Sequence, residues 1–138
     1  MRPQRLRELV AEVLSALPPE AVRVIEGTSH GRATLHLQPR AAGAVDVVLF
    51  HGLTGVDAVV GDSAAIEITA PYNVNYGPPE RGWDEDLRDV LQAVSRGQVL
   101  LGEDDAGRLA MVDIPGGRLG VSFGHRDRLR TRHPATWA

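Results

Sequence analysis

The sequence contains no cysteine and no lysine, and only 4% of its residues are aromatic. Without cysteine, disulfides, thiolate nucleophiles and cysteine-ligated zinc or iron–sulfur sites are excluded. Without lysine the Gly-Lys-Ser/Thr phosphate loop is excluded, and no Gly-x-Gly-x-x-Gly follows a predicted strand, so the usual motifs of kinases, NTPases and dinucleotide enzymes are missing. All 15 basic residues are arginine, a bias typical of GC-rich genomes.

Long apolar runs are also missing, since no stretch approaches the roughly 20 residues of a spanning helix. The N-terminus leads into an Arg/Glu-bearing amphipathic segment and not into an apolar signal core, so we expect no membrane contact and a cytoplasmic location. A net charge of -3 and a pI near 5.9 argue against nucleic-acid binding. At 138 residues the chain fits one domain, which we place at residues 1–124, followed by an Arg-rich, poorly packed tail at 125–138.

Hydrophobic periodicity predicts two amphipathic helices, from Arg5 to Leu17 and from about Asp84 to Arg96. Between and after them lie short strand-like segments at 22–26, 33–38, 45–51, 57–60, 65–69, 98–101, 108–114 and 118–123. The turns that separate them are too short for parallel crossovers. We therefore predict an α+β fold, an antiparallel sheet of about six to eight strands with two helices packed on one face.

The segment from Ala33 to Gln38 alternates most clearly. A period of two places Ala33, Leu35 and Leu37 toward the core and His36 outward.

One segment resembles the strand and oxyanion loop of α/β-hydrolases: VVLFHGLTG at 47–55. The sequence Gly-Asp-Ser-Ala-Ala follows it at 61–65. In that family the nucleophile occupies a Gly-x-Ser-x-Gly elbow between a strand and a helix. Here Ser63 lies only 12 positions after His51, the final glycine is missing, and strand-forming residues follow. We interpret Ser63 as a turn residue and assign no catalytic residue.

Metal and cofactor chemistry find no support in residue spacing. No two of the five histidines share the i, i+2 spacing of a strand or the i, i+4 spacing of a predicted helix: His30, His36, His51, His125 and His133. The acidic residues at 62, 84–86 and 103–105 fit turns and a helix N-terminus. We expect no metal and no cofactor.

The segment from Pro71 to Trp83 holds both tyrosines and one of two tryptophans. Such residues dominate protein interfaces, and proline would stiffen the loop before binding. The candidate partner-binding residues are Tyr72, Asn73, Asn75, Tyr76, Arg81 and Trp83. Alternatively, the tyrosines cover the sheet edge and Trp83 staples the second helix to the core through Leu87.

The C-terminal run from His125 to His133 places arginine at alternate positions: Arg126, Arg128, Arg130 and Arg132. In an extended conformation one edge would carry four guanidinium groups, suited to phosphate or an acidic partner. The alternative is a solvated tail.

In size, element order and composition the chain resembles small α+β proteins of GC-rich bacteria, among them immunity proteins of toxin systems and secretion-chaperone-like proteins. This resemblance implies a non-catalytic protein-binding or regulatory protein, with a homodimer as one form of association. A sheet edge offers unpaired amides for such contacts. The competing hypothesis is a small ligand-binding module or enzyme with a pocket between sheet and helices, and with His51, Asp57 or Tyr72 near its mouth.

Overall fold

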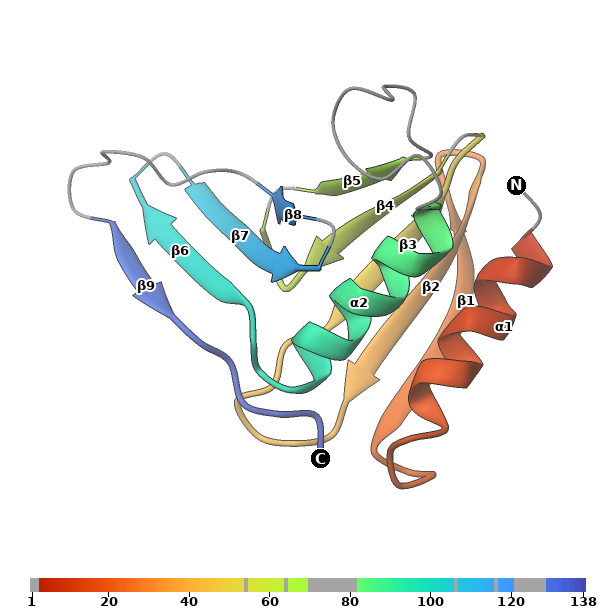
Figure 1. The fold of residues 1–138 in the computed structure, drawn as a ribbon, viewed down its shortest axis with the longest axis horizontal. Helices are drawn as coiled ribbons and strands as arrows, with labels where there is room; N and C mark the ends of the chain where they lie inside the picture. Colours follow the sequence, from red (N-terminus) through yellow and green to blue (C-terminus); the bar gives the residue numbers. More distant parts are fainter. Residues whose placement is uncertain are drawn as a thin grey trace.

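The computed structural model describes residues 3–53, 55–63, 65–69, 82–105, 107–115, 117–120 and 129–138. Two helices and nine strands occur in these residues, in the order α1(Pro3–Leu14), β1(Val22–Ser29), β2(Arg32–Pro39), β3(Val47–His51), β4(Gly55–Val60), β5(Ile66–Thr69), α2(Trp83–Ser95), β6(Leu100–Asp104), β7(Gly107–Ile114), β8(Gly117–Gly120) and β9(Arg130–Arg132). Every strand pair is antiparallel. The predicted α+β class is therefore confirmed (Figure 1).

The first five strands form one sheet in sequence order, β1-β2-β3-β4-β5. One face is buried, and in β2 it carries Leu35 and Leu37, as the alternation predicted. The register places Leu35 opposite Leu49. His36 points to the other face and is half-buried. Ala33 shares the inner face by alternation but is exposed, because it lies near the β1–β2 turn and away from the packed centre.

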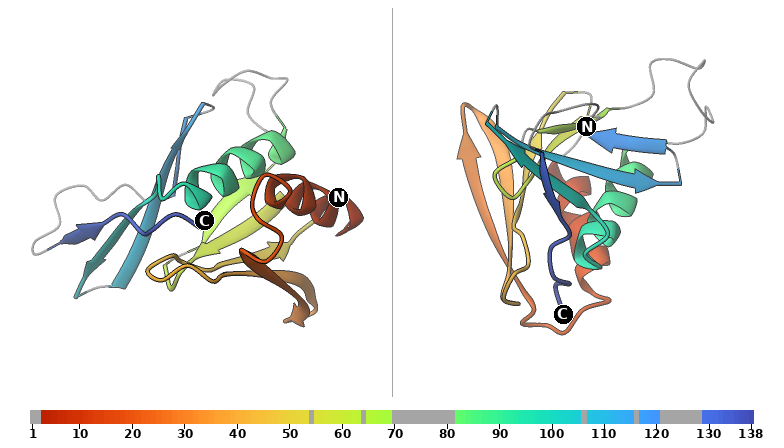
Figure 2. Two further views of the ribbon diagram at one scale, coloured as in Figure 1. Left: turned by 90° about the horizontal axis from the view of Figure 1, so that it is seen from below. Right: turned by 90° about the vertical axis from the view of Figure 1, so that its left-hand side faces the viewer.

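Both helices cover the inner face of this sheet (Figures 1 and 2). Four residues of α1 are buried, at the spacing of one helix face: Leu6, Leu9, Val10 and Val13. The helix ends at Leu14, three residues before the predicted end, and Leu17 packs against the core from the following turn. Two ion pairs connect the helices across their exposed sides, Arg5 to Asp84 and Arg88 to Glu12.

The remaining strands form a second sheet of order β8-β7-β6-β9, where one sheet was expected. Helix α2 lies between the two sheets, and Ala110 and Val112 of β7 are buried in the same core as α2. A broad apolar surface on α2 explains this arrangement, because the helix buries Leu87, Val90, Leu91, Ala93 and Val94. That surface is too wide for a single sheet to cover, so a second layer packs on it.

The C-terminal segment is the main correction to the sequence analysis. A poorly packed tail was expected at 125–138, but residues 130–132 form strand β9 and Pro134 and Trp137 are buried, whereas the other side chains from 130 to 138 are exposed and 121–128 lie outside the described residues. Strand β9 pairs with β6, and the side chain of Trp137 is only 1% exposed. The Trp137 backbone amide donates to the Ser95 carbonyl at 2.8 Å, and its indole Nε1 donates to the Val45 carbonyl at 3.2 Å. The local sequence is polar, so it gave no indication that this segment packs against distant parts of the chain.

Candidate functional site

Strand β1 forms a regular free edge of the five-stranded sheet. It joins β2 through the two-residue turn His30–Gly31, whose φ angles of 52° and 77° match the positive values that a type I′ turn requires. The residues that flank such a turn form a hydrogen-bonded pair, and from there hydrogen-bonded and non-hydrogen-bonded pairs alternate. At the far end the Arg40 amide donates to the Ala21 carbonyl at 2.9 Å, in phase with this alternation. The backbone groups that point away from β2 therefore belong to Val22, Val24, Glu26 and Thr28.

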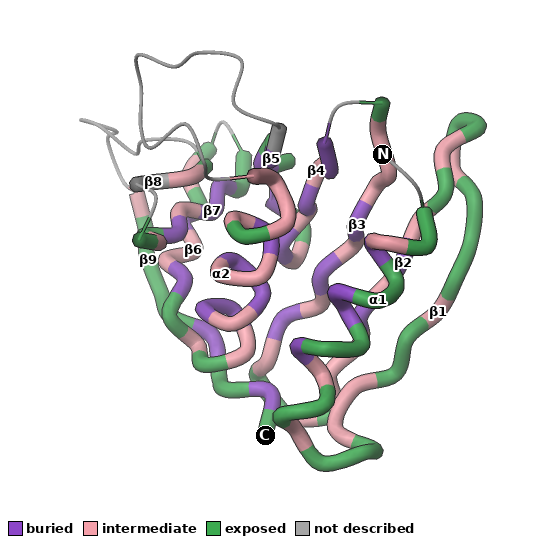
Figure 3. The backbone as a smooth tube through the Cα atoms, turned by 45° about the vertical axis from the view of Figure 1, so that its right-hand side comes forward, coloured by how far each residue is buried: buried purple, intermediate pink, exposed green. Residues whose placement is uncertain are grey.

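This edge carries few of the features that usually protect an edge strand. Proline, lysine and bulges serve that purpose in many proteins, but β1 contains neither residue, and its pairing runs without interruption from Val22↔Pro39 to Ser29↔Arg32. The other edge strands of the described residues are shorter: β5 and β8 have four residues each and contact one another, and β9 has three. The eight residues of β1 thus form the longest open edge in the part of the chain that the structure describes. In Figure 3 most of β1 is exposed or half-buried.

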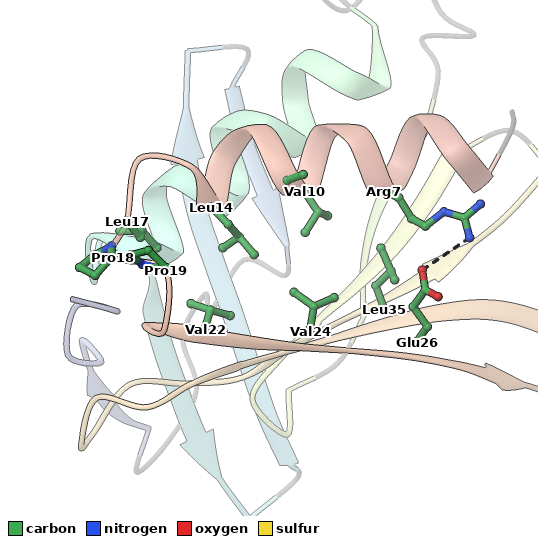
Figure 4. Close-up of a pocket in the computed structure, with 11 residues that line it drawn as sticks. Arg7, Val10, Leu14, Leu17, Pro18, Pro19, Val22, Val24, Glu26 and Leu35 are labelled. Carbon is green, nitrogen blue, oxygen red and sulfur yellow. Dashed lines mark hydrogen bonds and ion pairs between the residues drawn. The ribbon is translucent and has the colours of Figure 1, made fainter.

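An apolar groove lies beside this edge, between β1 and α1 (Figure 4). Its volume is about 380 Å³. Apolar side chains of α1, of the turn after it, of β1 and of β2 line it: Val10, Leu14, Leu17, Val22, Val24 and Leu35. An ion pair between Arg7 and Glu26, 3.5 Å apart and more than half exposed on both sides, lies at one end. Val24 is 42% exposed, one of two large hydrophobic residues in the described part of the chain with such exposure.

A second, larger cleft of about 700 Å³ lies between the ends of β3 and β4 and the second sheet. His36 Nε2 lies 2.8 Å from a carboxylate oxygen of Asp46 at its border. On the other wall Arg108 forms ion pairs with Asp62 and Glu103. The cleft is therefore polar and charged around its rim, and apolar residues form its base: Val45, Val60, Leu101 and Leu109.

Arg130 and Arg132 also line this cleft. Both belong to β9, so this part of the C-terminal arginine run is extended. The alternating arginines were considered in this conformation in the sequence analysis. Arg126 and Arg128 lie outside the described residues. The sequence thus indicated two of the cleft residues, but it gave no sign that Arg108 or the His36–Asp46 pair would lie beside them.

Most of the predicted partner loop falls outside the described residues: Tyr72, Asn73, Asn75, Tyr76 and Arg81. Trp83 is described, as the first residue of α2. Its half-buried side chain packs against the hydrophobic core. This position agrees with the alternative interpretation, in which Trp83 fastens the second helix to the core.

The hydrolase-like residues are not brought together. His51 pairs with Val56 at one end of the β3–β4 hairpin, whereas Ser63 follows Val60 at the other end. The Ser63 hydroxyl donates to the Val60 carbonyl at 2.6 Å, as in a turn. Geometry therefore agrees with the interpretation of Ser63 as a turn residue.

His51 and Asp57, expected near a pocket mouth, line neither the groove nor the cleft. Arg32 holds them together instead: its Nε donates to the His51 carbonyl at 2.8 Å, and its guanidinium pairs with the Asp57 carboxylate at 2.8 Å. The Arg32 guanidinium also lies 5.7 Å from the centre of the Phe50 ring. This cluster closes the end of the β3–β4 hairpin, so we assign it a structural role. Tyr72 lies outside the described residues.

Among the described residues, no three histidine or acidic side chains come close enough to hold a metal ion, and no helix is long and apolar enough to cross a membrane. A comparison of the chain with known protein families, curated proteins and solved structures found no match.

Proposed function

We propose that this protein is a non-catalytic protein-binding domain that takes up an extended segment of a partner protein along β1. The observation that carries the proposal is the open eight-residue edge of β1, with outward-pointing backbone groups on every second residue. An added strand forms main-chain hydrogen bonds with such an edge and directs alternate side chains to each face. Binding of this kind would suit an immunity-like or chaperone-like protein.

The α1–β1 groove supports a partner segment with apolar residues at alternate positions. Val22 and Val24 have backbone groups that point away from β2, and their side chains line this groove. A directly opposed partner residue lies on the same face of the extended sheet, so its side chain would enter the groove too. Main-chain bonds then supply affinity with little sequence preference, and the groove selects the apolar residues.

A second copy of the chain fits the edge less well. Two β1 strands paired antiparallel about a two-fold axis must place residues of the same face opposite one another. If the axis passes through Val24 or Ile25, Glu26 lies beside Val22 or Val24 of the other copy, at its apolar groove. If the axis passes through Glu26, two carboxylates face each other, which is destabilising. Homodimerisation through β1 is therefore the alternative that the experiment must separate.

The experiment selects peptides of eight random residues displayed on phage against the purified protein. We expect the enriched peptides to carry apolar residues at alternate positions and to bind V24P at least about tenfold more weakly. Proline removes an outward-pointing N–H without breaking the β1–β2 ladder, so V24P should fold, which circular dichroism will verify. V24K should also reduce binding, because it places a charge in the groove.

Leu53 offers a matched control, because it is the other large, exposed hydrophobic residue, at 93%, and lies in the β3–β4 turn. L53K should bind the selected peptides as the wild type does. Peptides without alternation, or equal binding by wild type, V24P and V24K, would overturn the proposal. Light scattering supplies the remaining outcome: a wild-type dimer that V24P converts to a monomer would show that the edge binds a second copy in place of a partner.

A further inference from the structure

The cleft between the two sheets contains two guanidinium groups that form no ion pair with a described carboxylate. Arg130 and Arg132 occupy alternate positions of β9 and therefore share one face of the strand. In the described residues neither lies within ion-pair distance of an acidic side chain, although Glu103 is the cross-strand neighbour of Arg130. Two exposed cations held side by side on a paired strand repel one another, so an anion between them is favoured.

The acidic residues of the cleft are already paired. Asp46 contacts His36, while Asp62 and Glu103 both contact Arg108. Arg108 is thus shared by two carboxylates, and with His36 counted as neutral the three arginines of the lining equal its three carboxylates in number, so Arg130 and Arg132 are the two arginines that no described carboxylate contacts.

The base of the cleft is apolar. Val45, Val60 and Leu109 are buried, and Leu101 is partly buried against the core. Together with the charged rim they enclose about 700 Å³. Small-molecule sites have volumes of roughly 300–1,000 Å³, with mostly apolar walls and a few polar groups that fix orientation. This cleft has such a volume, and its walls combine apolar side chains with a larger share of charged ones.

We infer that the cleft binds a small organic anion, a carboxylate or phosphate monoester attached to an apolar body. The anionic group lies between Arg130 and Arg132, because guanidinium groups form paired hydrogen bonds with the oxygens of both anions. The apolar body covers Val45, Val60 and Leu101 and adds hydrophobic burial that an inorganic anion cannot provide. An extended polyanion is disfavoured, because Asp46, Asp62 and Glu103 repel phosphates beyond the two arginines.

Isothermal titration calorimetry with four probes tests this inference: naphthyl phosphate, naphthoate, neutral naphthol and inorganic phosphate. We expect at least one of the two aromatic anions to bind, and naphthol and inorganic phosphate to bind at least about tenfold more weakly. The two aromatic anions distinguish a phosphate ligand from a carboxylate ligand.

The variants are R130Q, R132Q and the double substitution, with R23Q as the matched control. Arg23 is also an exposed strand arginine with no ion pair in the described residues, and it lies on β1, away from the cleft. The double variant should weaken binding of the aromatic anion by about tenfold or more, and R23Q should leave it unchanged. Thermal melts should show that all variants remain folded, because these side chains are exposed.

Four results would overturn the inference. Equal binding of naphthol would show an apolar site without anion recognition, and equal binding of inorganic phosphate would show that the apolar base contributes nothing. Unchanged binding in the double variant, or no saturable heat at millimolar probe, would show that Arg130 and Arg132 form no such site. None of these outcomes depends on the β1 edge, so the inference and the proposed function succeed or fail separately.

Discussion

Trp137, the penultimate residue, should be among the most important single side chains for stability. It is one of the largest fully buried residues, and its two hydrogen bonds reach Ser95 at the end of α2 and Val45 before β3. Through its backbone amide and its indole, Trp137 thereby joins segments from both halves of the chain. Replacement of Trp137 by alanine removes the packing of the indole and its hydrogen bond to the Val45 carbonyl. The backbone hydrogen bond to Ser95 does not depend on the side chain.

The expected loss follows from the buried area. A buried aromatic side chain removes roughly 150–250 Å² from water, and at about 25 cal/mol per Å² this corresponds to about 4–6 kcal/mol. Part of that surface is already covered in the unfolded chain, so we expect W137A to lose about 3–5 kcal/mol of unfolding free energy. W137F keeps most of the ring but leaves the Val45 carbonyl without its donor, and should lose about 1–3 kcal/mol.

Urea unfolding followed by circular dichroism measures these losses. The chain has two tryptophans, so W83F provides a background in which Trp137 is the single tryptophan. If W137A is already unfolded in the absence of urea, W137F still provides a measurement of the loss. A loss below about 0.5 kcal/mol in both variants, the level of an ordinary surface substitution, would refute the assignment of Trp137 to the core.

Three further substitutions test other parts of the fold in the same unfolding assay. G97A should lower the free energy of unfolding by about 1–3 kcal/mol, because Gly97 has a φ of 70° and an added Cβ would lie 2.6 Å from the Pro134 carbonyl oxygen. An unchanged urea midpoint would contradict this packing. G31A should lose about 1 kcal/mol, since the φ of 77° in the β1–β2 turn disfavours a side chain although the space around it is open; G31N should lose less. R32M should lower the free energy of unfolding by about 1 kcal/mol, because Arg32 donates hydrogen bonds to two backbone carbonyls and to Asp57. R40M is the control: it breaks only a highly exposed ion pair and should leave the free energy of unfolding unchanged.

Local periodicity predicted the helices and most strands because each of these elements buries one face. In β2 the alternation identified Leu35 and Leu37 as core residues, and in α2 the apolar spacing gave boundaries within one residue of those observed. The end of β1 was less clear, since the strand-like segment was predicted to end at residue 26, whereas β1 continues to Ser29. The dipeptide His30–Gly31 marks the true turn, and a type I′ assignment there would have extended β1 to Ser29.

Pairing between distant segments could not be predicted from periodicity. Strand β9 consists of Arg130, Thr131 and Arg132, all exposed, so nothing in its sequence distinguishes it from a solvated tail. Its conformation comes from β6, about thirty residues earlier. The division into two sheets and the position of the cleft between them depend on such long-range contacts, which is why the candidate site was only partly predictable.

The same C-terminal segment connects core stability with the cleft. Strand β9 has only three residues, and its position depends on the pairing with β6 and on the anchored residues that follow it. Trp137 is the strongest anchor, and the carbonyl that accepts its indole hydrogen bond belongs to Val45, which lines the cleft. W137F should therefore weaken binding of the aromatic anion, while peptides selected on β1 still bind, because the α1–β1 groove contains none of these residues. If W137F binds both ligands as the wild type does, pairing with β6 alone is enough to position the two arginines, and the proposed coupling through Trp137 is wrong.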